Sequence, residues 1–81
     1  MELFHAIGDA GSAAARRELV ALGLDDGRVK MRNVVYPEAE ADFAARGGKQ
    51  VPALWDGARL VEGERAVIEA LRAFAKSAAT G

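Results

Sequence analysis

Few residues of this sequence have side chains that could do covalent or metal chemistry. There is no cysteine among the 81 residues, which excludes disulfides, cysteine-based metal sites and thiol catalysis by this chain alone. The single histidine, His5, has no apparent serine or cysteine partner and is interpreted as a packed or edge-exposed side chain. The acidic residues do not follow the Asp-x-Asp-x-Asp-Gly spacing of a calcium loop, so we expect no metal site.

The segment Gly8-Asp9-Ala10-Gly11-Ser12 combines turn residues with two residues that commonly cap helices. Either Asp9 or Ser12 can accept a hydrogen bond from a backbone N–H in the first turn of the helix that follows. Alanine and leucine dominate the next ten residues, with Ala15, Leu19 and Leu22 on the apolar stripe and Gly23 as the stop. The sequence therefore predicts a strand, a tight turn and a capped helix at its start.

The remaining elements follow from hydrophobic periodicity and from turn residues such as Asp56-Gly57, which is typical of a β-hairpin. Right-handed crossovers make the first two strands parallel, and the hairpin adds an antiparallel pair. We predict an α/β fold of order β-α-β-α-β-β-α, with a four-stranded mixed sheet flanked by three helices. The predicted elements are strand Glu2–Ile7, helix Ala13–Leu22, strand Val29–Val35, helix Glu38–Arg46, strand Val51–Trp55, strand Arg59–Val61 and a last helix that begins near Gly63.

Composition limits the function classes. A chain of 81 residues has room for one hydrophobic core, so we predict a single domain over residues 1–76 and a flexible tail over 77–81. The net charge of -1 with 28% charged residues is typical of a globular protein and not of a nucleic-acid binder. No apolar run approaches a membrane span of about 20 residues, and no signal core is apparent, so we expect a cytoplasmic protein with neither nucleic-acid nor membrane partners.

Several short motifs resemble a known superfamily. The first half is similar to the start of glutathione-transferase N-terminal domains, and the Val51-Pro52 pair followed by Gly63 equally resembles glutaredoxins. The matching segments are Met1 to Phe4, Gly8 to Ser12, Arg16, Leu19 to Leu24, Lys49 to Leu54, Asp56-Gly57, Leu60 and Arg65 to Ile68. The resemblance implies a thioredoxin-like fold of the glutaredoxin type and glutathione as a ligand, with no required cofactor.

The resemblance also assigns positions to candidate site residues. Asp9 and Ser12 stand where the families have their active-site cysteine or serine residues, so the thiol chemistry of glutaredoxins is excluded. Ser12 has two open interpretations, a helix cap or a ligand contact. Pro52 is implied to be cis, which would offer the Val51 main chain to an extended peptide; the alternative is that the proline only shapes the fold.

Four more ligand-binding candidates follow from the same resemblance. Gly63 and Glu64 stand where family members hold the γ-glutamyl end, although Glu64 replaces a neutral hydroxyl and weakens the field of the helix N-terminus for an anion. Lys49 and Gln50 stand where family members contact the glycyl carboxylate, or are simply solvated loop residues. The full set of ligand-binding candidates is Asp9, Ser12, Lys49, Gln50, Val51, Pro52, Gly63 and Glu64.

The first functional hypothesis is a redox-inactive glutaredoxin-like domain, which binds glutathione or an extended peptide segment as a scaffold module. A second is a glutathione-dependent enzyme, a glutaredoxin or a transferase, in which Asp9 has replaced the nucleophile. A third is a homodimer that pairs through the exposed edge of its small sheet, with Trp55 as a contact. No residue is assigned a catalytic role.

Overall fold

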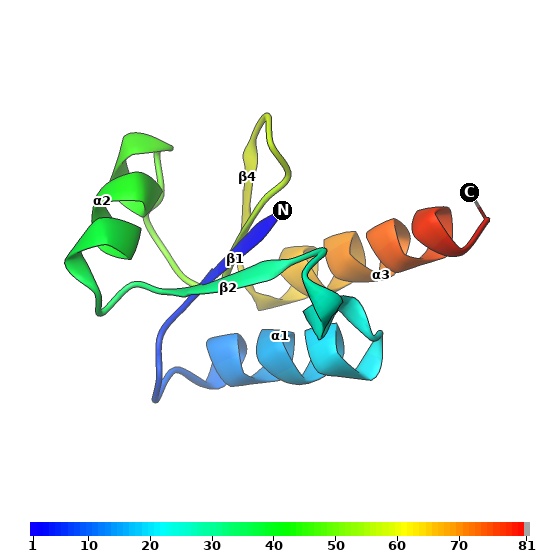
Figure 1. Cartoon of the computed structure of the whole chain (residues 1–81). Coiled ribbons are helices and arrows are strands. Elements are labelled where there is room, and N and C mark those ends of the chain that lie inside the picture. Colours follow the sequence, from blue (N-terminus) through cyan, green and yellow to red (C-terminus); the bar gives the residue numbers. More distant parts are fainter. Residues whose placement is uncertain (81) are drawn as a thin grey trace.

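The computed structural model describes residues 1–80, with side chains through residue 77. Its elements follow the predicted order of β-α-β-α-β-β-α (Figure 1). The domain is therefore α/β, in an arrangement compatible with a thioredoxin-like fold. The elements are β1 (Glu2–His5), α1 (Ala10–Ala21), a short 3-10 helix (Leu24–Asp26), β2 (Lys30–Asn33), α2 (Pro37–Ala45), β3 (Ala53–Trp55), β4 (Leu60–Glu62) and α3 (Glu64–Thr80).

The four strands form one mixed sheet in the order β2-β1-β3-β4. β1 is parallel to β2, with His5 opposite Asn33, and antiparallel to β3, with Phe4 opposite Ala53. β3 and β4 form the expected antiparallel hairpin. In Figure 1, α1 and α3 lie on one face of this sheet and α2 on the other. Because β1 and β3 are antiparallel, the C-terminal end of β1 lies beside the beginning of β3. The turn before α1 therefore lies next to the Val51–Pro52 pair.

The main core lies between the sheet and the two helices α1 and α3. Leu3 of β1 and Leu54 of β3 point to this face and are fully buried. The predicted stripe of α1 is confirmed, because Ala15 and Leu19, four residues apart, are buried there. Val67 and Leu71 repeat that spacing on α3. The 3.6-residue period of the two helices therefore produces one continuous apolar layer.

The opposite face, under α2, combines aromatic rings with ion pairs. Phe4 of β1 is fully buried, and its ring centroid lies 5.3 Å from that of Phe43 on α2. The guanidinium groups of Arg32 and Arg46 lie 5.5 and 5.6 Å from the centre of the Phe4 ring. Both arginines also pair with Glu2, Arg46 at 2.7 Å. This layer is therefore held by cation–π contacts and a shared carboxylate as well as by apolar burial.

The first boundaries differ from those predicted, each for a local reason. β1 ends at His5, two residues early, because Asp9 N–H donates to the Ala6 carbonyl across a turn and Gly8 has a φ of 91°. α1 begins at Ala10, three residues early, because Asp9 is its N-cap. β2 ends at Asn33, whose side chain accepts from Val35 N–H and closes a turn.

Further boundaries differ nearer the C-terminus. β3 begins at Ala53 and not at the predicted Val51, and β4 covers Leu60–Glu62 and not Arg59–Val61. α2 begins at Pro37, one residue before the predicted Glu38, because a proline in the first position of a helix loses no hydrogen bond. α3 continues to Thr80, so residues 77–80, which we predicted as tail, continue this helix. Gly81, the end of that predicted tail, lies outside the described residues. No helix in the described part of the chain is long and apolar enough to cross a membrane.

Candidate functional site

The tip of α1 carries the two residues that stand at the family's active-site positions. The Asp9 carboxylate accepts a hydrogen bond from Ser12 N–H at 2.8 Å and caps the helix. The Ser12 side chain is fully buried, and its hydroxyl accepts from Ala6 N–H at 3.1 Å. Ser12 therefore fastens the end of β1 to α1 and faces the protein interior.

Three segments distant in the sequence meet beside this tip. A Cβ atom built on Gly11 would lie 3.2 Å from Pro52 Cδ and 3.4 Å from both the Cβ and the Oε1 atoms of Glu64. The Val51–Pro52 peptide bond is cis. The first turn of α1, the cis-proline and the start of α3 are thus in contact. We call the surface formed by Gly11, Val51, Gly63 and Glu64 around the buried Pro52 the cis-proline surface.

Hydrogen bonds from the β3–β4 hairpin hold the cis-proline surface. Gly63 N–H donates to the Pro52 carbonyl at 2.9 Å. The Glu62 carboxylate accepts from Lys49 N–H at 3.2 Å and from Gln50 N–H at 2.8 Å. The main chain that precedes the cis-proline is therefore anchored to β4, while the side chains of Lys49 and Gln50 are exposed.

Val51 differs from its neighbours in its hydrogen bonding. Within residues 1–80, neither its N–H nor its carbonyl has a partner, although Gln50 N–H and the Pro52 carbonyl are both bonded. Val51 is also partly exposed. A donor and an acceptor are thus available to an extended chain that lies alongside Val51.

Two carboxylates lie at the tip of α1, beside the cis-proline surface. α1 has no acidic residue in its own first turn, but the Asp9 side chain caps it and the Glu64 carboxylate lies next to Gly11. These carboxylates offset the partial positive charge of the helix N-terminus. The tip of α1 is therefore a poor place for a further anion.

The eight predicted site residues do not all face one surface. Val51, Pro52, Gly63 and Glu64 come together, and Asp9 lies at the adjoining helix cap. The Ser12 side chain is buried and bonded to the end of β1. Two residues of this region were not identified from the sequence. Gly11 is where α1 comes closest to Pro52 and Glu64, and Glu62 anchors the main chain before the cis-proline to β4. The only local signal for Gly11 was a second glycine in the turn.

His5 lies on the main-core side of β1, with an exposed fraction of 6%. Arg16 Nη1 donates to His5 Nδ1 at 3.0 Å and to the Ala6 carbonyl at 3.3 Å. Burial, followed by the charge of Arg16, lowers the pKa of His5. The interpretation of His5 as a packed side chain agrees with this position. Trp55, the other aromatic candidate, is partly buried and stacks under the Arg46 guanidinium at 4.7 Å.

Comparisons with protein-family models, with curated proteins and with solved structures found no match for this chain. Among the described residues, no group of three or more acidic or histidine side chains could hold a metal ion.

Proposed function

We propose that this chain is a redox-inactive module with a thioredoxin-like fold of the glutaredoxin type, and that its cis-proline surface binds glutathione or another extended peptide. Recognition uses the main chain of Val51, which pairs with the ligand as an added antiparallel strand does. The exposed Lys49 and Gln50 side chains lie next to Val51 in sequence and contact the carboxylate end of the ligand.

The observation that supports this proposal most directly is the free main chain of Val51. Its N–H and carbonyl have no partner within residues 1–80, while Gly63 and Glu62 hold the residues on either side. A donor and acceptor pair that is already ordered needs little further entropy loss on binding. Because the recognition is by main chain, it does not depend on a cysteine.

The charges at the tip of α1 argue against thiol activation. Two like charges about 4 Å apart repel by roughly 1 kcal/mol in water and by about 4 kcal/mol at an effective dielectric of 20. A glutathione thiolate next to the Asp9 and Glu64 carboxylates would be destabilised by an amount of this order. We therefore propose that a bound thiol remains protonated and that the module binds without reacting.

Isothermal titration with reduced glutathione, glutathione disulfide and a cysteine-free extended tripeptide tests this proposal. Lys49→Ala should weaken the binding of ligands that carry a free C-terminal carboxylate, whereas Arg17→Ala, which removes an exposed cation of α1 outside the cis-proline surface, serves as the matched control. We expect amide chemical-shift changes at Gly11, Val51 and Gly63. If millimolar ligand produces neither heat nor shifts at these residues, ligand binding by the cis-proline surface is wrong.

The enzymatic alternative is tested separately with Asp9→Cys. That variant introduces a thiol at the N-terminus of α1, the position at which a catalytic cysteine of a glutaredoxin would stand. We expect it to lack thiol-transfer activity and to show no lowered thiol pKa, because the Glu64 carboxylate remains beside the helix tip. A reactive, low-pKa thiol in this variant would favour the enzymatic hypothesis instead.

A further inference from the structure

β2 is an outer strand of the sheet, and its main chain is open on one side. Lys30 N–H donates to the Met1 carbonyl, and Val34 N–H donates to the His5 carbonyl, both at 3.0 Å. Since successive residues of a strand alternate in direction, Met31 and Asn33 direct their main-chain groups away from β1. The Asn33 carbonyl accepts from the N–H that begins the next turn. Among the described residues 1–80, nothing bonds the N–H and carbonyl of Met31 or the N–H of Asn33.

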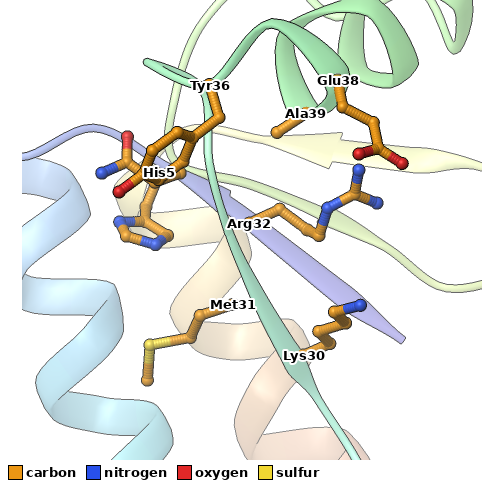
Figure 2. Close-up of a pocket in the computed structure, with 8 residues that line it drawn as sticks. His5, Lys30, Met31, Arg32, Tyr36, Glu38 and Ala39 are labelled. Carbon is orange, nitrogen blue, oxygen red and sulfur yellow. The ribbon is translucent and has the colours of Figure 1, made fainter.

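A cavity of about 310 Å³ lies along this open edge. Figure 2 shows it from the side of β2, with His5, Met31 and Tyr36 on one side of the strand and Lys30 and Arg32 on the other. The residues that line the cavity therefore flank the free main chain of β2 on both sides. None of the residues of the cis-proline surface lines this cavity.

His5 presents a hydrogen-bond donor to the cavity. Arginine can only donate, so the bond from Arg16 makes His5 Nδ1 an acceptor and leaves the ring proton on Nε2. No described residue accepts from Nε2, yet every fully buried side-chain nitrogen and oxygen of the described residues has a partner. Nε2 is therefore not sealed inside the protein, and it reaches solvent through the cavity that His5 lines.

Several other polar groups at this edge are donors; Glu38, the one carboxylate among the described residues that line the cavity, lies on the same side of β2 as Arg32 (Figure 2). Asn33 Oδ1 accepts from Val35 N–H at 3.0 Å, which leaves the side-chain NH₂ group of Asn33 available. Lys30 is exposed and has no ion pair with a described carboxylate. Arg32 differs, because Glu2 and Asp42 already neutralise it. On the His5 and Asn33 side of the open strand the side chains therefore favour acceptors, and on the other side Lys30 favours negative charge.

We propose that the open edge of β2 binds an extended, acidic peptide segment of another protein. The segment pairs with the main chain of Met31 and Asn33 and continues the sheet by one strand. Its side chains alternate, so that one glutamate or aspartate accepts from His5 Nε2 and the Asn33 amide while the next lies opposite Lys30. A second copy of this chain is a worse occupant, because its β2 would bring the same donors and the same lysine.

The probe is a hexapeptide with blocked termini and the sequence Glu-Glu-Val-Glu-Glu-Val. Its control is the same peptide with lysine at every glutamate position. At a free acidic peptide concentration of about ten times Kd, hydrogen exchange of the Met31 amide should slow about tenfold, since only the unbound fraction exchanges. The lysine peptide should give no protection. Protection confined to Val51 and Gly63 would overturn the proposal, as would equal binding of the two peptides.

Two variants examine the charge and the main chain separately. Lys30→Glu should weaken the acidic peptide about fivefold or more, whereas Arg17→Glu, the same charge change on an exposed residue of α1, should alter Kd less than about twofold. Met31→Pro removes the N–H that points away from β1 and should abolish pairing with the peptide. The fold should tolerate this change, because edge strands accept proline where the N–H faces outward.

Sedimentation of the protein alone is the last arm of the test. Self-association that Met31→Pro removes would assign this edge to a second copy and overturn the proposal. A Kd that is the same for Lys30→Glu and the unmodified chain would do so as well. Both outcomes leave binding at the cis-proline surface untouched, because that surface shares no residue with this edge.

Discussion

Gly48, which follows the C-terminal end of α2, lies against the ring of Phe43. Its N–H donates to the Phe43 carbonyl at 2.9 Å. A Cβ atom built on Gly48 would overlap the Cε1, Cδ1 and Cζ atoms of that ring. Gly48 is not among the glycines with positive φ, so the requirement for glycine is steric. Gly48→Ala should therefore destabilise the fold by overpacking.

The size of this effect follows from what holds the Phe43 ring. The ring packs against Phe4 at 5.3 Å between centroids, and Phe4 is fully buried. Phe43 can relieve the overlap only by moving outward, which weakens that aromatic contact. Overpacking of this kind costs about 1–3 kcal/mol. At about 4–8 °C per kcal/mol for a domain of this size, Gly48→Ala should lower Tm by roughly 4–24 °C.

The neighbouring Gly47 provides a matched control. It has a φ of 83° and open space around its Cα, so Gly47→Ala should cost about 1–2 kcal/mol through backbone strain alone. Phe43→Leu gives the methyl group room in Gly48→Ala but does nothing for Gly47→Ala. Urea denaturation of the single and double variants should show a coupling of about 1 kcal/mol for the first pair and none for the second. Equal coupling in both pairs, or none in either, would refute the steric argument.

Three further predictions concern polar groups. Ser12→Ala should lower the free energy of unfolding by about 1–3 kcal/mol, since Ala6 N–H loses its acceptor; an unchanged urea midpoint would contradict this. Glu2→Gln should cost about 1–2 kcal/mol, because two half-buried guanidinium groups lose their shared carboxylate, whereas Asp26→Asn, in an exposed pair, should have much less effect; equal losses would be the contrary result. The lowered pKa of His5 means that the unfolded chain binds more protons below pH 6.5. Stability should therefore fall as the pH drops from about 7.5 to 5.5, and His5→Gln should flatten that slope; the same slope in both proteins would rule this out.

The sequence by itself determined the order of the elements and the identity of the main core. Those features depend on short-range patterns, such as the four-residue spacing of Ala15 and Leu19 and the Asp56-Gly57 turn. The structure confirms both, because Ala15 and Leu19 are buried and β3 and β4 form a hairpin. Asp9 was also identifiable as a helix cap, because capping involves residues only three apart. The glutaredoxin-type assignment and the ligand remain predictions that the experiments above test.

Only the tertiary structure decided which of these residues face each other. Glu2 and Arg46 are 44 positions apart, and no local pattern links them. The same is true of the approach of Gly11 to Pro52 and Glu64, and of the direction in which Ser12 points. The open edge of β2 depends on which strand is outermost in the sheet. Such contacts arise when packing brings together segments that are distant in the sequence. Local periodicity contains no information about which distant segments will meet.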